Sequence, residues 1–201
     1  MEIIILPLGP LETNCYVVYD EASRVCALVD PGAMPQKILD CLREHELSLQ
    51  LILLTHAHFD HTGALKKLHE CYPQVPIYVS VPDTDDAINM SHGNLVYTNT
   101  FSNGDEISLP PMTFRVLATP GHTKGSCCLI CDRVIFSGDT LFAGTCGRTD
   151  LPGGSETEIL ASLSRLAGLA GNYRVLPGHG PETTLERERK TNPYMREASC
   201  L

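Results

Sequence analysis

The sequence predicts an α+β protein in which two β-sheets pack together and helices cover their outer faces. Short apolar runs of strand length dominate the first part of the chain. Segments with apolar residues at helical spacing lie between these runs, and the second half again mixes strands with helices. The 201 residues suffice for the core of one domain spanning residues 1–201.

The first half opens on strands and then alternates helices with strands. Ile38 and Leu42 stand at helical spacing behind Pro35, a residue favoured in the first turn of a helix. Asp-Pro-Gly at 30–32 ends the strand before that helix sharply. The elements expected here are strands over 3–6, 15–19, 25–29, 51–54 and 76–79, and helices over 35–45, 63–71 and 83–90.

The second half combines a run of strands with two helices. Ile159, Leu163 and Leu166 make 157–169 amphipathic, as expected of a helix lying on a sheet. Thr183 or Thr184 caps a last helix that runs to about 192, ahead of Pro193. The strands expected are 105–108, 112–117, 127–131, 134–136 and 174–176.

A cluster of ligand-type side chains directly follows the predicted strand 51–54. His56, His58, Asp60 and His61 lie within six residues of one another. Burying such groups without partners is unfavourable, and imidazole with carboxylate suits zinc as well as iron, cobalt and nickel. A divalent metal is therefore expected at the edge of the sheet where this strand ends.

Three further candidate ligands follow later strands, each in a turn that contains glycine. They are His122 in Pro-Gly-His, Asp139 in Ser-Gly-Asp and His179 in Pro-Gly-His-Gly. Glycine permits the tight backbone that aims such side chains out of a turn. Seven candidates exceed the needs of one tetrahedral metal, so the pattern favours two metals that share a bridging carboxylate.

Composition and charge restrict the kinds of binding partner and the cellular compartment that we expect. The formal net charge of −9 disfavours binding to nucleic acid or to an anionic membrane. No run reaches the length of a membrane span, and residues 1–7 lack the basic start of a signal peptide, so a cytoplasmic protein is expected. The nine cysteines, an odd number, read as reduced thiols, and Cys128 and Cys131 should point to opposite faces of one strand.

The order of these ligands resembles the metallo-β-lactamase fold over nearly the whole chain. The segments 55–61, 119–123, 137–142 and 177–180 resemble the glyoxalase II (hydroxyacylglutathione hydrolase) branch, in its short single-domain form. The resemblance implies an αββα sandwich with the site at one edge of the two sheets. It also implies two divalent ions, zinc with iron or manganese as alternatives. One would bind His56, His58 and His122, the other Asp60, His61 and His179, with Asp139 bridging them.

The same resemblance implies a hydrolase that cleaves a small-molecule thioester. S-D-lactoylglutathione or a related acyl thioester would be attacked by a metal-bridging hydroxide, and Asp60 would also orient the nucleophile. Arg148 aligns with a basic residue that contacts the glutathione carboxylate in this family, although Asp150 stands where an aromatic residue is expected. Full-length glyoxalase II carries a further helical segment, whereas only 22 residues follow His179 here.

Two alternatives stay open. The loop Cys-Gly-Arg-Thr-Asp at 146–150 also resembles persulfide dioxygenases of the same fold, which hold a single iron through positions matching His56, His122 and Asp139. A non-catalytic, metal-stabilised domain is the other alternative, but structural zinc sites are usually closed and rich in cysteine. A β-lactamase is disfavoured because those enzymes are secreted, and a nuclease because a basic surface is absent from the sequence pattern.

Overall fold

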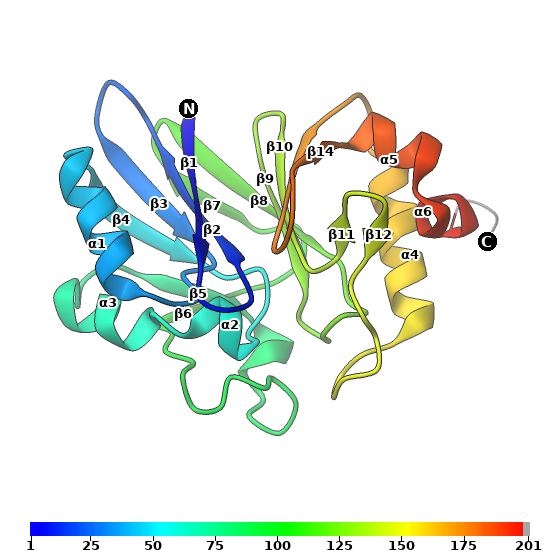
Figure 1. The fold of residues 1–201 in the computed structure, drawn as a ribbon, viewed down its shortest axis with the longest axis horizontal. Coiled ribbons are helices and arrows are strands. Elements are labelled where there is room, and N and C mark those ends of the chain that lie inside the picture. The colour runs from blue at the N-terminus through cyan, green and yellow to red at the C-terminus, as the bar shows by residue number, and fades with distance from the viewer. Residues whose placement is uncertain (199–201) are drawn as a thin grey trace.

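Two six-stranded sheets pack face to face in the computed structural model, which describes residues 1–198, and helices cover both outer faces (Figure 1). This arrangement confirms the predicted αββα sandwich. None of the helices within residues 1–198 has the length and apolar character needed to cross a membrane. Of the predicted reduced cysteines, the eight in the described part of the chain are free, and Cys200 lies outside it.

The first sheet follows chain order, with three antiparallel strands and then three parallel ones. Its strands are β1 (Glu2–Leu8), β2 (Thr13–Tyr19), β3 (Val25–Val29), β4 (Ser48–Leu53), β5 (Ile77–Ser80) and β6 (Asn99–Phe101). Parallel neighbours need crossover connections. The crossover from β3 to β4 contains α1 (Pro35–Glu44), and the one from β4 to β5 contains α2 (Phe59–Thr62) and α3 (Leu65–Cys71). Residues 81–98 connect β5 to β6. Ile38, Leu42 and Leu68 pack from α1 and α3 onto the outer face of the sheet.

The second sheet has the order β14-β13-β10-β9-β8-β7. Its strands are β7 (Glu106–Leu109), β8 (Met112–Ala118), β9 (Cys127–Cys131), β10 (Val134–Gly138), β13 (Arg174–Pro177) and β14 (Thr183–Thr184). The helices α4 (Glu156–Ala167), α5 (Leu185–Thr191) and α6 (Pro193–Ala198) cover it, and a small hairpin joins β11 (Leu141–Phe142) to β12 (Thr145–Cys146). Ile159, Leu163 and Leu166 of α4 are buried, as the helical spacing predicted.

Side-chain alternation divides the buried apolar residues of the strands among three layers. Tyr16 and Val18 of β2 lie between the sheets, whereas Cys15 and Val17 lie under α1 and α3. In β9, Cys131 lies between the sheets and Cys128 on the opposite face under the C-terminal helices, as the strand period of two predicted.

One predicted helix is absent, and two short helices were not predicted. Residues 83–90 do not form a helix; a short 3₁₀ helix, η1 (Val81–Thr84), is followed by turns in which the side chains of Asp85 and Asn89 accept from the amides of Ala87 and Ser91. Such local bonds compete with those of a helix.

The helix predicted over 63–71 is confirmed as α3, whereas the short helix α2 before it was not predicted. Thr184 caps α5, as one of the two predicted alternatives, and α5 ends at Thr191, ahead of Pro193 as predicted. The helix α6, which begins at Pro193, was not predicted; proline is tolerated in the first turn of a helix.

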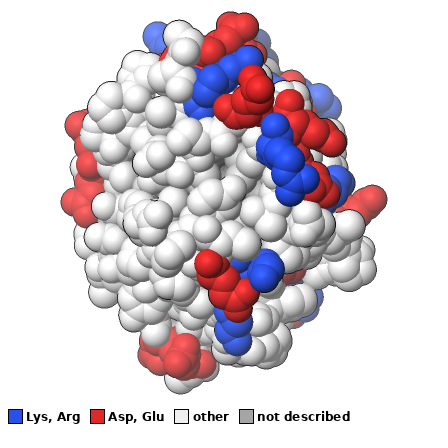
Figure 2. All heavy atoms as spheres, turned by 90° about the vertical axis from the view of Figure 1, so that its left-hand side faces the viewer, with Lys and Arg blue, Asp and Glu red and all other residues white. Residues whose placement is uncertain are grey.

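The surface over α1 and α3 carries charges of both signs. On this face Lys and Arg side chains lie beside Asp and Glu, as Figure 2 shows. Arg43 pairs with Asp40 at 3.0 Å and Lys67 with Glu70 at 3.1 Å. The drawn face therefore lacks the single-sign basic patch that a nucleic-acid-binding surface would present.

The turn after β3 packs against α2 with no space for a side chain. A Cβ atom on Gly32 would lie 1.7 Å from the carbonyl oxygen of Asp60, and the amide of Ala64 donates to the carbonyl of Pro31 at 3.0 Å. Because α2 carries Asp60 and His61, this backbone contact sets where these two side chains lie.

We predict that Gly32→Ala lowers the free energy of unfolding by about 1–3 kcal/mol, because the new methyl group forces two backbones apart. Gly168→Ala is the matched control, since Gly168 has φ −77° and its Cβ would meet ordinary contacts at 3.5 Å. The control should be neutral or gain about 0.4–1 kcal/mol. Urea denaturation of both variants measures the difference, and equal stabilities would contradict the close contact.

Candidate metal centre

The structure brings together the seven side chains that the sequence nominated, at the edge where strands of both sheets end. His56 and His58 follow β4, and Asp60 and His61 belong to α2. The other three come from loops after the second sheet's strands, His122 after β8, Asp139 after β10 and His179 after β13. Within residues 1–198 these seven form three groups of three whose ligand atoms lie within 4.8 Å of one another.

The first group consists of His56, His58 and His122, all buried. Nδ1 of His58 and Nε2 of His122 approach to 2.9 Å, and the rings of His56 and His122 lie 4.8 Å apart, nearly perpendicular. Three imidazoles facing one point form the protein part of a three-histidine metal site.

The second group consists of Asp60, His61 and His179. Asp60 Oδ2 lies 3.2 Å from Nε2 of His179 and 3.5 Å from Nε2 of His61. His61 is fully buried, while His179 is the most exposed of the three. A mixed histidine and carboxylate set of this kind suits a second divalent ion.

Asp139 lies between the two groups. Its Oδ1 is 3.4 Å from Nε2 of His61, and its Oδ2 is 3.4 Å from Nε2 of His122 and 3.6 Å from Nε2 of His179. One carboxylate thus faces both sets, which is the position that a bridging ligand would occupy.

Unsatisfied polar atoms concentrate at this cluster. Five buried side-chain nitrogen or oxygen atoms within residues 1–198 lack a hydrogen-bond partner, and four of them are Nε2 of His56, His58 and His61 and Oδ1 of Asp139. Each such atom costs roughly 1–3 kcal/mol when it stays unpaired. The donor set therefore fits divalent cations.

The protonation states of His56 and His58 also fit metal binding. Burial, with His122 and His61 nearby, lowers the pKa of His58 to about 4, and burial with neighbouring imidazoles holds the pKa of His56 well below its usual value. Both rings are therefore neutral near pH 7, the form that ligates a metal. Burial alone would raise the pKa of Asp60, but the hydrogen bond from His179 and the charge of His61 outweigh it and leave the carboxylate ionised.

A second layer of hydrogen bonds fixes the outward nitrogen of several rings. Nδ1 of His61 lies 2.9 Å from Oδ2 of Asp30, whose other oxygen accepts from the amide of Thr55 at 2.8 Å. Asp30 therefore orients a ring of the cluster. Nδ1 of His122 lies 2.8 Å from the carbonyl oxygen of Arg148. Such partners set the tautomer and direction of a ligating imidazole.

Asp83 belongs to this second layer and was missed by the sequence interpretation. Its Oδ2 accepts from the amide of Ala57 and from Oγ1 of Thr123, both at 3.0 Å, and its Oδ1 accepts from the amide of Gly125 at 2.7 Å. This fully buried carboxylate ties the loop of His56 and His58 to the loop of His122. No local pattern in the sequence could have shown it, because its partners lie 26 to 42 residues away.

A cavity of about 470 Å³ opens directly over the cluster. Besides five of the seven residues, it is lined by Leu11, Phe59, Met90, Arg148 and Leu151. The Arg148 guanidinium forms two 2.7 Å hydrogen bonds to the Asp150 carboxylate, and both side chains are more than half exposed. Arg148, the predicted substrate-binding residue, thus lines the cavity, and its charge is paired with that of Asp150.

Comparison with known sequences gives one consistent family. A model described as the metallo-beta-lactamase superfamily matches residues 8–179. A Bacillus subtilis protein named probable metallo-hydrolase YqgX is 36% identical over 94% of this chain and 95% of its own. The hydroxyacylglutathione hydrolase GloC of Haemophilus influenzae is 29% identical over 99% of this chain and 100% of its own.

Solved structures agree on the fold and carry different names. The B3 metallo-β-lactamase BLEG-1 has a TM-score of 0.88 and 33% identity over 96% of this chain and 99% of its own. TTHA1623 in a di-iron-bound form has a TM-score of 0.82 and 37% identity over 95% and 99%. ETHE1 from Myxococcus xanthus has a TM-score of 0.83 and 31% identity over 96% and 84%.

We predict that Asp83→Asn weakens metal retention and lowers the free energy of unfolding by about 1–3 kcal/mol, because an amide cannot accept from all three donors. Asp86→Asn, an exposed neighbour in the same run, is the control and should change neither property. Metal content after dialysis and urea denaturation are the two readouts. Wild-type metal content in Asp83→Asn would show that the two loops hold their places without this carboxylate.

Proposed function

Because the chain belongs to the metallo-β-lactamase superfamily, we propose that it is a metal-dependent hydrolase acting on an acyl thioester. The observation that carries this proposal is the convergence of seven ligand-type side chains in two sets, with Asp139 facing both. Two metals would be held by His56, His58 and His122 and by Asp60, His61 and His179. The metals in question are divalent, with zinc the first expectation and iron or manganese the alternatives.

Glutathione thioesters are the first substrate class to test. The relative GloC is a hydroxyacylglutathione hydrolase, and this chain matches it over its whole length. A relative of this length thus carries that name without the longer C-terminal segment of full-length glyoxalase II. S-D-lactoylglutathione, a small molecule, is therefore the reference substrate.

The chemistry consists of adding water to a thioester carbonyl and breaking the carbon–sulfur bond. Bound divalent ions lower the pKa of a coordinated water and polarise the carbonyl. Asp60 lines the cavity and is held by a 2.9 Å hydrogen bond from Oγ1 of Thr13, so it lies where it can orient the attacking water. The products are a carboxylic acid and a thiol, and the good leaving group reduces the need for a general acid.

The persulfide dioxygenase alternative rests on ETHE1 and on the loop 146–150. In that scheme a single iron on His56, His122 and Asp139 would leave Asp60, His61 and His179 without a metal. The packing of these three around Asp139 and the di-iron form of TTHA1623 favour two metals instead. The sequence disfavoured a β-lactamase, but the similarity to BLEG-1 makes β-lactam hydrolysis a further activity to be assayed.

We predict two metals per chain and thiol release from S-D-lactoylglutathione, both lost on chelation and both reduced in His58→Ala and Asp139→Ala. Elemental analysis gives the stoichiometry, and thiol release, oxygen uptake with glutathione persulfide and hydrolysis of a β-lactam are assayed side by side. One iron with oxygen uptake, above all with full activity in His58→Ala, would replace the proposal by the dioxygenase. β-lactam cleavage without thiol release would equally overturn it.

We further predict opposite effects of Arg148 and Asp150 on affinity for a glutathione thioester. An exposed ion pair contributes only about 0.2–1 kcal/mol, so a substrate carboxylate can replace Asp150 on the guanidinium. Arg148→Ala should raise KM severalfold, more than it lowers kcat, whereas Asp150→Ala should lower KM. The backbone carbonyl that holds His122 is present in both variants.

An uncharged acetyl thioester is the control for this pair of variants. Its KM should be the same in Arg148→Ala, Asp150→Ala and the wild type, because it has no carboxylate for the guanidinium. Equal shifts for the charged and uncharged substrates would show that the loop 146–150 has changed shape, and would remove the argument for Arg148 as a substrate-binding residue.

A further inference from the structure

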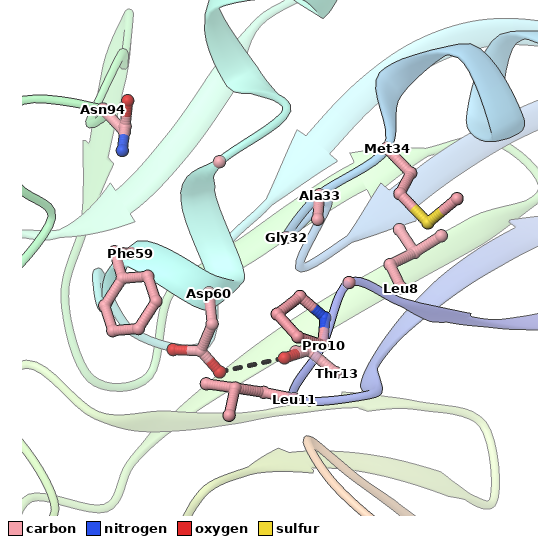
Figure 3. A pocket seen from close by; sticks show the side chains of 12 residues that line it. Leu8, Pro10, Leu11, Thr13, Gly32, Ala33, Met34, Phe59, Asp60 and Asn94 are labelled. Carbon is pink, nitrogen blue, oxygen red and sulfur yellow. Dashed lines mark hydrogen bonds between the residues drawn. The ribbon is translucent and has the colours of Figure 1, made fainter.

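A second cavity, of about 290 Å³, adjoins the cavity over the cluster. Figure 3 shows it between the loop joining β1 to β2, the segment before α1 and the start of α2. The apolar side chains that line it are Leu8 at the end of β1, Pro10 and Leu11 from the loop, Ala33 and Met34 from the segment before α1, and Phe59 from α2. None of these side chains is among the seven candidate metal ligands.

The lining is almost entirely apolar. Among its twelve residues, all in the described part of the chain, Asp60 is the one charged side chain, and its Oδ2 already accepts from Oγ1 of Thr13 (Figure 3). Arg148 lines the other cavity and is absent from this one. An anionic glutathione moiety would find no cation here, whereas an aliphatic group would exchange water for apolar contacts.

The two cavities have three lining residues in common. Leu11, Phe59 and Asp60 line both of them. The two cavities therefore adjoin, and a molecule whose carbonyl lay at the cluster would have its acyl side next to the apolar cavity. Its thiol side would then remain on the Arg148 side of the larger cavity.

Several large apolar side chains around this cavity are exposed to solvent. Leu11 is 53% exposed, Met34 52% and Phe59 41%. Met34 also holds a left-handed backbone, with φ 48°, which is uncommon for a residue other than glycine. A grouped set of exposed apolar side chains next to a cavity is typical of a ligand-binding surface.

We propose that this cavity, lined by Leu8, Pro10, Leu11, Ala33, Met34 and Phe59, binds the aliphatic acyl chain of the substrate. The inference rests on the proposed thioester hydrolysis and names its substrate class: thioesters whose acyl group is longer and more apolar than lactoyl. Met34 and Ala33 are then residues that determine specificity for the acyl chain.

The test is a series of thioesters with one thiol and acyl groups from acetyl to octanoyl. Burial of each methylene is expected to raise kcat/KM about fourfold until the cavity is full. Met34→Asn removes an apolar wall while keeping a residue type that tolerates the left-handed backbone. Ala33→Leu fills the cavity. Both variants should lower the octanoyl-to-acetyl ratio of kcat/KM, and Tyr97→Asn, exposed and outside the lining of both cavities, should not.

A binding measurement separates this inference from the proposed activity. Ketone analogues, in which a methylene replaces the thioester sulfur, cannot be cleaved, and calorimetry should show Kd falling about fourfold per acyl methylene. That slope should flatten in Met34→Asn. If thioesters are cleaved but neither kcat/KM nor Kd depends on acyl length, the acyl site is overturned and the hydrolase stands. If no thioester is cleaved but the slope appears and Met34→Asn flattens it, the acyl site stands and the hydrolase is overturned.

Discussion

Removing five imidazoles and two carboxylates from water is the constraint on which this architecture depends. Buried polar groups need partners, and charges need them most. Asp30 and the carbonyl oxygens of Arg148 and Leu11 contact the outward nitrogens of three histidines. The inward atoms then face one another and can be satisfied by cations. The two sheets make this arrangement possible, because their strand ends bring together residues such as Leu11 and His179, which lie more than a hundred residues apart in the chain.

Much of the fold was predictable because its apolar pattern is local. The alternation in β2 and β9 and the spacing in α1 and α4 follow from the period of each element. The one predicted helix that is absent lies over 83–90. This run is rich in Asp and Asn, which favour turns over helix interiors, and Asp85 and Asn89 accept from the nearby amides of Ala87 and Ser91. The three-residue β6 is too short to give a periodic signal.

The candidate site was predictable for a different reason. Metal-ligand chemistry admits few residue types, so His and Asp at strand ends stand out in the sequence, and the structure gathers all seven. Their supporting contacts could not be predicted, because many use backbone atoms that every residue has. The apolar cavity was missed in the same way: Leu8, Met34 and Phe59 look like ordinary core or surface residues until the β1–β2 loop lies beside α2.

His122 is held by the main-chain oxygen at position 148, while the side chain at that position faces the cavity and Asp150. Any amino acid supplies that oxygen. The side chain at position 148 can therefore change during evolution, and with it the chemical group that faces a ligand, while the hydrogen bond to His122 is retained. A substitution at position 148 can therefore change substrate preference and leave the position of His122 as it is. In this way one scaffold can acquire different activities.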